Sequence, residues 1–446
     1  MSKTYNVADL FCGAGGESTG IMQAAEMTGM KVNLLAINHW ERAIETHAKN
    51  HPGAEHLCES IEHIDPVKAV PDQKLNLLWA SPACTHFSVA RGGKPRSNQS
   101  RATPWVILDW LTQLQVERVI IENVPEFMSW GPLTREGLPV QSKKGDTFRA
   151  FITAIQSLGY MVDWQVLCAA NYGDPTTRRR LFIQAVKGRK KIMWPEITHM
   201  EGINLMGYQS WRSAREIIDW SIPGASIFDR KKPLAPATIR RIEAGIKKYW
   251  GDYAKPFLAI LHGTSTVKSI DEPLSTIACS GAHHMLVEPM LLGQQSGAAA
   301  RPVNQPCPTV ATAGAISLIE PLIMEYYGNG KTDTTSKPLG TVTTKDRFAL
   351  MEPFLVQCAH GGGELSRTSP INEPVPALTC SNEYAVIQNL SFDIRLRMLK
   401  SHELKRAQGF PDDYILTGNV AEQVKQIGNA VPVNTARALA LTAMSA

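Results

Sequence analysis

The hydrophobic pattern predicts alternating strands and helices at both ends of the chain. Apolar runs of strand length occupy residues 5–11, 32–38, 75–80 and 118–121, and amphipathic helical patterns occupy residues 17–27, about 39–50, 105–115 and 401–408. Residues 161–185 predict two further strands, and the chain ends in another helix. Short unbroken apolar runs are typical of strands buried on both faces of a sheet. The sequence therefore predicts an α/β fold built on an open sheet.

Candidate chemistry follows two neighbouring strands. Cys84 lies just past the run 75–80, which breaks at Ser81-Pro82, and Glu122 ends the next buried run. In open α/β sheets ligands bind in the crevice outside the carboxyl ends of the strands, so both side chains should face a substrate there. A thiol can act as a nucleophile and a carboxyl group can exchange a proton. The residues alone leave open a buried inert cysteine and a structural carboxylate.

Glycines and arginines mark further loops at this edge. The first strand runs into the turn 12–16, Cys-Gly-Ala-Gly-Gly, before a helix, a pattern that suits close approach of a cofactor. The loop 88–103 carries four cations and no acid, which favours a polyanionic substrate. Arg178 and Arg180 flank Arg179 before another strand, and alternation places the outer two on one face. Surface charge is the alternative for all three.

The middle of the chain has a different pattern. Glu-Pro recurs at residues 288, 320 and 352, a period of 32 residues. A Pro-x-x-Thr signature recurs at residues 273, 306 and 338, with a degenerate copy at 374. Short strands separated by Gly and Pro indicate an all-β module, inserted between two pieces of one α/β domain. It could serve recognition or act only as a spacer.

Composition indicates a class of partner and excludes other classes of protein. With 446 residues the chain is long enough for two domains. The net charge is +5, but residues 178–255 hold 17 Lys plus Arg against 7 Asp plus Glu, an electrostatic footprint for nucleic acid. The eight cysteines form no Cys-x-x-Cys pair, so we expect reduced thiols and no structural metal. We also expect no membrane span and no signal peptide.

Six motifs together resemble those of the DNA (cytosine-5) methyltransferases. They are DLFCGAGG, SPACTHFS, IENVPEF, TTRRRLFI, RAQGFP and QIGNAVPV, in the family's usual order over roughly residues 7–183 and 395–441. The resemblance implies a Rossmann-like class I methyltransferase sheet. It implies a catalytic domain in residues 1–190, completed by 391–446. Between them, residues 191–390 would form a target-recognition region with a basic segment and four β repeats at about 253–388.

The resemblance also implies a reaction. The enzyme would transfer a methyl group from S-adenosylmethionine to carbon 5 of cytosine in DNA at a short specific sequence. Cys84 would add to carbon 6 of a flipped-out base, because the carbon is inaccessible inside a duplex. Glu122 would hold or protonate ring nitrogen 3, and Arg180 would hold the exocyclic oxygen. Asn123 and Arg178 complete the expected catalytic set.

Cofactor and DNA contacts follow by the same matching of motifs. The expected cofactor residues are Phe11, Gly13, Ala14, Gly15, Gly16, His39, Trp40, Ser60, Ile61, Pro82, Asn429 and Val431. The expected DNA contacts are Ser88, Arg91, Lys94, Arg96, Arg101, Arg240 and Arg241. Five positions depart from the family pattern, namely His39, Ser60, Ala83, Thr85 and Thr176. The core reaction needs none of these, but cofactor affinity and loop contacts could differ.

The expected setting is the cytoplasm of a bacterial or phage-infected cell, in association with the nucleoid. The partner would be double-stranded DNA bound by a monomer, and a cognate restriction endonuclease could accompany it. Two other functions stay open. One branch of the family methylates transfer RNA, but its recognition region is small, whereas this insertion spans about 200 residues. A catalytically inactive DNA-binding relative is the other.

Overall fold

The computed structural model describes the α/β part of the chain and isolated strands of the rest. Described are residues 4–82, 103–134, 139–188, 190–202, 207–222, 267–274 and 392–445, with short strands and single positions between residues 225 and 386. The chain divides into two compact units. The larger comprises Met1–Trp220, Leu261–His284 and Met398–Ala446, and the smaller comprises Ser221–Ile260 and Met285–Arg397. Among the described helices, none is both long and apolar enough to cross a bilayer.

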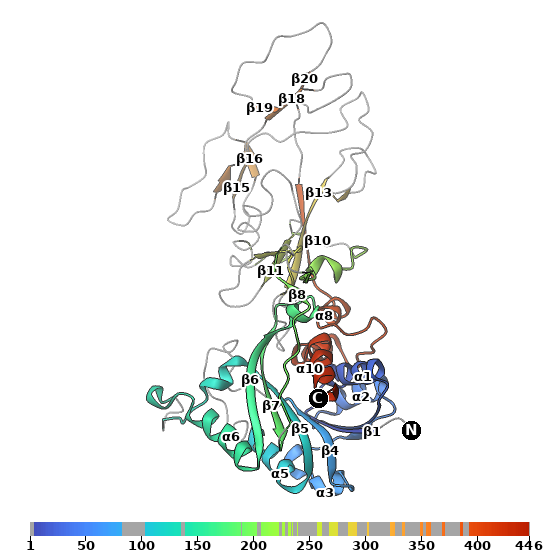
Figure 1. Ribbon diagram of the computed structural model, residues 1–446. Coiled ribbons are helices and arrows are strands. Elements are labelled where there is room, and N and C mark those ends of the chain that lie inside the picture. The colour runs from blue at the N-terminus through green and yellow to red at the C-terminus, as the bar shows by residue number, and fades with distance from the viewer. Residues whose placement is uncertain are drawn as a thin grey trace. The chain divides into compact units, whose positions relative to one another are not determined.

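A seven-stranded sheet forms the centre of the larger unit, with strand order β3-β2-β1-β4-β5-β7-β6 (Figure 1). Its strands are β1 (Thr4–Leu10), β2 (Lys31–Ile37), β3 (Glu55–Leu57), β4 (Lys74–Ala80), β5 (Gln115–Asn123), β6 (Tyr160–Cys168) and β7 (Arg179–Lys187). The first five are parallel, whereas β7 runs antiparallel to both β5 and β6. The α/β fold with a central sheet is thus confirmed.

Helices cover both faces of this sheet. They are α1 (Gly16–Thr28), α2 (Glu41–Asn50), α3 (Pro66–Ala69), α5 (Val106–Gln113), α6 (Asp146–Ser157), α8 (Ser401–Ala407), α9 (Val420–Asn429) and α10 (Val433–Ser445). Apolar residues of α5 and α6 pack on one face, and those of α1 and α10 pack on the other. Figure 1 shows α1 beside α10, the first and last helices of the chain.

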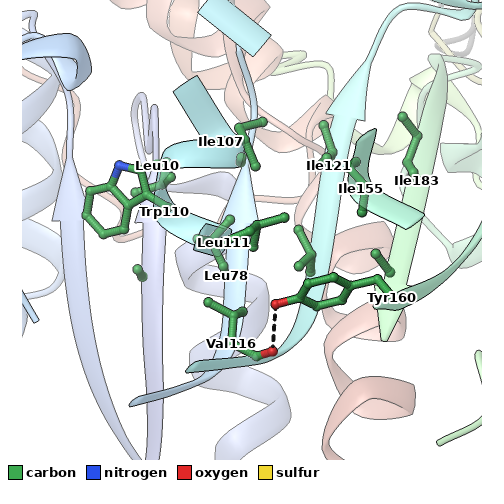
Figure 2. Packing of buried hydrophobic residues seen from close by; sticks show 14 of the residues in the cluster. Leu10, Leu78, Ile107, Trp110, Leu111, Val116, Ile121, Ile155, Tyr160 and Ile183 are labelled. Atoms are coloured by element: carbon green, nitrogen blue, oxygen red, sulfur yellow. Dashed lines mark hydrogen bonds between the residues drawn. The ribbon is translucent and has the colours of Figure 1, made fainter. Parts of the chain in front are cut away.

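The apolar runs predicted from the sequence form this core. Leu10, Leu78, Ile121 and Ile183 come from four adjacent strands and are at most 1% exposed (Figure 2). The Tyr160 hydroxyl donates to the carbonyl oxygen of Val116 at 2.9 Å, which ties edge strand β6 to β5 (Figure 2). Burial on both sides explains why these strands read as continuous apolar runs rather than as alternating ones.

One buried carboxylate attaches the C-terminal helix to the sheet. Asp174, in the loop between β6 and β7, accepts the N–H groups of Asn434 and Thr435 at 3.1 and 3.0 Å. It also accepts the Thr435 hydroxyl at 2.9 Å. These donors lie in the first turn of α10, whose N–H groups lack partners within the helix. The end of the chain therefore completes the domain that its beginning starts.

The described residues of the smaller unit include several β strands. One sheet has the order β10 (Ala225–Ser226), β21 (Phe392–Met398), β13 (His284–Leu291), β11 (Phe257–Ile260) and β12 (Val267–Ser269), with β14 (Arg301–Pro302) on β13. Two three-stranded antiparallel sheets follow, centred on β15 (Leu322–Glu325) and β18 (Phe354–Gln357). Each central strand starts within two residues of a Glu-Pro pair. The repeat as a structural unit stays a prediction.

Candidate active site

The first strand runs into a turn built from left-handed residues. Phe11, Gly13 and Gly15 have φ angles of 68°, 53° and 86°. The N–H of Gly15 donates to the Cys12 carbonyl oxygen at 2.8 Å, and α1 begins at the next residue. A positive φ is unusual for a residue with a bulky side chain such as Phe11, so packing must hold this turn. It brings main chain to the strand end, as a closely approaching cofactor requires.

The C-terminal segment closes against this turn. A Cβ atom built on Gly16 would lie 2.1 Å from the Val431 carbonyl oxygen, and one on Gly15 would lie 2.7 Å from the Tyr414 hydroxyl. That hydroxyl donates to the carbonyl oxygen of Ala14. The structure therefore brings the first and last predicted cofactor motifs together, although more than 400 residues separate them. Only glycine fits at positions 15 and 16.

The ends of β2 and β3 supply the next predicted cofactor residues. The Asn38 Oδ1 accepts the N–H of Trp40 at 2.9 Å, which fixes the start of α2. The Lys425 ammonium, from α9, lies 4.1 Å from the centroid of the Trp40 ring. His39 is exposed, and the hydroxyl of Ser60 donates to the Glu62 carboxylate. His39 and Ser60 depart from the family pattern, and neither side chain supplies the carboxylate that is usual at its position.

A cavity lies beside the short helical turn that follows β3. Its volume is about 360 Å³, and its lining includes Ile61, Val106 and Trp110. Ile61 is 5% exposed and belongs to the short turn after β3. The glycine turn and the Trp40 ring suit a bound nucleoside with an amino-acid tail. The residues present are therefore compatible with S-adenosylmethionine.

Asn123 connects the two strands that carry the predicted catalytic groups. Its Nδ2 donates to the carbonyl oxygen of Pro82 at 3.3 Å, and its Oδ1 accepts the N–H of Val124 at 2.9 Å. Asn123 is 1% exposed and ends β5, whereas Pro82 lies two residues past the end of β4. This bond holds the main chain where it leaves toward position 84. Asn123 acts here through its side-chain amide.

Glu122 and Arg180 form an ion pair at the same edge. The Nε of Arg180 lies 3.0 Å from Oε1 of Glu122, and the two side chains are 14% and 8% exposed. Because β7 is antiparallel to β5, its first residues lie beside the last residues of β5, with Asn123 opposite Leu181. The antiparallel direction thus brings an arginine at the start of one strand to a carboxylate at the end of another.

The neighbouring arginines have different surroundings. Arg178 is 3% exposed, and its Nη1 donates to the carbonyl oxygen of Gly428 at 3.0 Å. Arg179 is exposed. Alternation predicted that the outer two arginines share a face; both are shielded in the structure, and Arg180 pairs with Glu122. Arg178 holds the end of α9, one residue before the predicted cofactor residue Asn429, and that residue's side chain is exposed.

Two buried acids beneath the glycine turn were not predicted. Asp9 and Glu17 are 0% and 2% exposed. Burial raises the pKa of Asp9 to about 7, although the Ser18 hydroxyl, which donates to it, lowers it. Burial, and then the charge of Asp9, hold the pKa of Glu17 well above its usual range. Asp9 is the first residue of the motif DLFCGAGG. The direction in which its side chain points follows only from the pleat of β1.

A histidine cluster packs behind the same turn. The Nδ1 of His47 lies 2.8 Å from the Nε2 of His56, and the Thr19 hydroxyl lies 3.0 Å from the Nε2 of His51. Burial lowers the pKa of all three, that of His51 to about 4. His47 lies in α2 and His51 caps the end of that helix four residues later, a spacing that could have indicated a shared face.

Several predicted site residues lie outside the described part of the chain. They are Cys84, with its neighbours Ala83 and Thr85, and the DNA contacts Ser88, Arg91, Lys94, Arg96, Arg101, Arg240 and Arg241. Their roles stay predictions. What the structure does fix is the main chain that leads to them, through Pro82 on one side and the helical turn Thr103–Trp105 on the other.

Comparison with known proteins agrees with these motifs. The sequence profile described as C-5 cytosine-specific DNA methylase matches residues 5–205 and 331–444. The type II methyltransferase M.AgeI of Thalassovita gelatinovora is 30% identical over 200 residues, 44% of this chain and 42% of that protein. M.SacI of Streptomyces achromogenes is 28% identical over 211 residues, 45% of this chain and 52% of that protein. The match thus spans about half the length of these relatives.

Solved structures share the fold. The Entamoeba histolytica methyltransferase EhMeth superposes with a TM-score of 0.50 at 12% identity, covering 100% of this chain and 99% of its own. A DNMT2 variant of Spodoptera frugiperda superposes with a TM-score of 0.51 at 15% identity and covers 99% of both chains. At these identities the likeness concerns the arrangement of the elements alone.

Proposed function

Because this chain belongs to the C-5 cytosine-specific DNA methylase family, we propose that it methylates carbon 5 of cytosine in double-stranded DNA at a short specific sequence. One observation carries the proposal beyond family membership. The ion pair between Glu122 and Arg180 stands beside the strand end that leads to Cys84. A carboxyl group and a guanidinium side by side can read the ring nitrogen and the exocyclic oxygen of one pyrimidine.

The proposed reaction uses three side chains. The Cys84 thiolate adds to carbon 6 of the cytosine, and the electron pair of the 5,6 double bond moves to make carbon 5 nucleophilic. Glu122 supplies a proton or a hydrogen bond to ring nitrogen 3, and so offsets the charge that develops on the ring. Arg180 holds the exocyclic oxygen and fixes the orientation of the ring.

S-adenosylmethionine, when bound, supplies an electrophilic methyl group to carbon 5. The glycine turn and the Val431 main chain would hold it, with Trp40 against its adenine. After transfer a proton leaves carbon 5, the bond between Cys84 and carbon 6 breaks, and the double bond returns. Asn123 keeps the main chain before Cys84 in place through Pro82. The base must leave the duplex to reach these groups.

Residues 191–390 are proposed to select the DNA sequence. The excess of cations in residues 178–255 supports a contact with phosphates. The β strands of the smaller unit would present loops to the grooves, where base edges can be read. The relatives carry type II names, so a cognate restriction endonuclease is part of the proposal.

The decisive test is base-resolution sequencing of 5-methylcytosine in DNA from cells that express this chain. We expect methylation at one short motif with the wild type and none with Cys84→Ala. Cys58→Ala is the matched control, because Cys58 is a free and exposed thiol elsewhere in the same domain. A folded protein that binds S-adenosylmethionine but leaves DNA cytosine unmethylated would overturn the proposal. The transfer RNA of the expressing cells should then be examined for 5-methylcytosine.

A further inference from the structure

A short segment of the middle region is attached to the catalytic unit. Residues 267–274 lie between β11 and β13 in sequence; β11 belongs to the smaller unit, and so does β13 from Met285 onward. The segment itself belongs to the larger unit. Its apolar residues Val267, Ile270 and Leu274 are 4%, 1% and 0% exposed. We call Ile270–Leu274 the strap. Its last two residues begin the first copy of the Pro-x-x-Thr signature.

The strap is bonded to the segment that leads into the arginines. The N–H of Leu274 donates to the Pro175 carbonyl oxygen at 2.9 Å, and the Leu274 carbonyl oxygen accepts the N–H of Thr177 at 2.6 Å. These two bonds clamp Thr176, which is fully buried. Paired main-chain bonds of this kind fix one strand relative to another along its length and across it.

A second attachment holds the other end of the strap. The N–H of Ala214 donates to the Glu272 carbonyl oxygen at 2.7 Å, and that of Arg215 donates to the Ile270 carbonyl oxygen at 2.6 Å. The Nε of Arg215 also lies 2.8 Å from Oδ1 of Asp271. The strap is therefore held at both ends by main-chain bonds and cannot shift alone.

The clamped segment leads directly to the reacting pair. Thr177 precedes Arg178, which bonds to Gly428. Arg180, three residues after Thr177, contacts Glu122. An extended chain of three residues has little slack. A displacement of the strap would therefore move the guanidinium relative to the substrate ring. Misplacement of a catalytic group by about 1 Å can lower a rate about 100-fold.

We propose that the strap is a positioning element for the reaction, in which Leu274 sets the place of Arg180. Through the chain on either side, the strap also links Arg180 to the smaller unit, whose loops are proposed to read the DNA sequence. The inference rests on the proposed function. Because the chain on both sides of the strap continues into the smaller unit, DNA bound there can act on the arginine segment through this covalent connection. Leu274 touches no reacting atom and is a positioning residue.

The test separates positioning from stability. We compare Leu274→Ala and the conservative Leu274→Met with Leu111→Ala, a cavity of similar size in α5, where Leu111 is 3% exposed. Leu274→Ala should lower kcat on unmethylated DNA about 10- to 100-fold, with KM for DNA and Kd for S-adenosylmethionine within about twofold. Leu274→Met should restore most of the rate. Leu111→Ala should lower Tm comparably and leave kcat close to the wild type.

A second measurement needs no variant. Hydrogen exchange of the wild type is measured with and without unmethylated DNA and S-adenosylhomocysteine. When both ligands are bound, exchange should slow both in the peptides that cover residues 174–180 and in those that cover 267–274. Equal kcat for Leu274→Ala and Leu111→Ala, or unchanged exchange in the DNA-bound wild type, would overturn the inference alone. A wild type that binds cofactor but methylates no DNA would remove the proposed function, and the inference with it.

Discussion

The Nε of Arg180 lies 3.0 Å from Oε1 of Glu122, with both side chains largely shielded from water. Their motif neighbours have other partners, since Arg178 bonds to Gly428 and Asn123 bonds to Pro82. In a partly desolvated place the pair is stronger than at the surface, and loss of one partner leaves the other without compensation. This relationship makes the pair the first target for mutation.

Glu122→Gln keeps the shape of the side chain but removes its negative charge and its ability to give up or take up a proton. We expect kcat for methyl transfer to fall about 10²- to 10⁴-fold, the usual contribution of a positioned acid or base. Glu117→Gln is the control, because Glu117 lies on the same strand and pairs with Lys190 at 2.8 Å near the surface. Equal rates for the two variants would show that Glu122 takes no part in the chemistry.

Gly16→Ala should disrupt the cofactor cradle. The new Cβ would lie 2.1 Å from the Val431 carbonyl oxygen, which belongs to the main chain and cannot swing away. We expect a loss of about 1–3 kcal/mol in the free energy of unfolding. Titration calorimetry should give at least about a tenfold weaker Kd for S-adenosylmethionine.

Gly53→Ala controls for the substitution itself, because a Cβ there meets nothing within 4 Å. It should leave both quantities close to the wild type. If Gly16→Ala binds the cofactor as tightly as Gly53→Ala does, the turn and the Val431 segment do not form the cofactor site together.

The histidine cluster predicts acid sensitivity. The pKa of His51 is lowered from 6.5 to about 4 by burial and by the charge of His56. The unfolded chain therefore binds more protons between these values, so this contribution to stability is present above pH 6.5 and is lost as the pH falls toward 4. His51→Gln should make the decrease in unfolding free energy over this window shallower by more than about 1 kcal/mol.

Urea unfolding of the wild type and His51→Gln at several pH values measures this difference. Carboxylates such as Asp9 also titrate, but they are common to both proteins and cancel in the comparison. Parallel curves for the two proteins would mean that His51 does not stay neutral in the folded state.

The Lys425 ammonium, 4.1 Å from the Trp40 ring centroid, should help to hold that ring in place. A cation over an exposed aromatic ring contributes about 0.5–1 kcal/mol. Lys425→Met should therefore raise the Kd for S-adenosylmethionine about two- to fivefold. Lys49→Met, on the exposed face of α2, is the control. Tighter binding by Lys425→Met would instead mean that the ammonium competes with the cofactor for the ring.

Local sequence patterns were enough to predict the main strands and helices and the edge of the sheet at which the site lies. The buried run before Ser81 forms β4, and the run that ends at Glu122 forms β5, because apolar periodicity and turn residues act over a few positions. The adjacency of these two strand ends followed from the parallel order alone. Alternation likewise predicted that Arg178 and Arg180 share a face that Arg179 does not.

Which of these side chains meet depends on how the strands and helices pack in three dimensions. The antiparallel direction of β7 brings Arg180 to Glu122, and the clamp of Leu274 on Thr176 joins residues almost 100 positions apart. The His47 cluster and the buried acids Asp9 and Glu17 depend on which elements pack behind the glycine turn. Such contacts are set by strand direction and packing across the whole domain, which no short window of the sequence encodes.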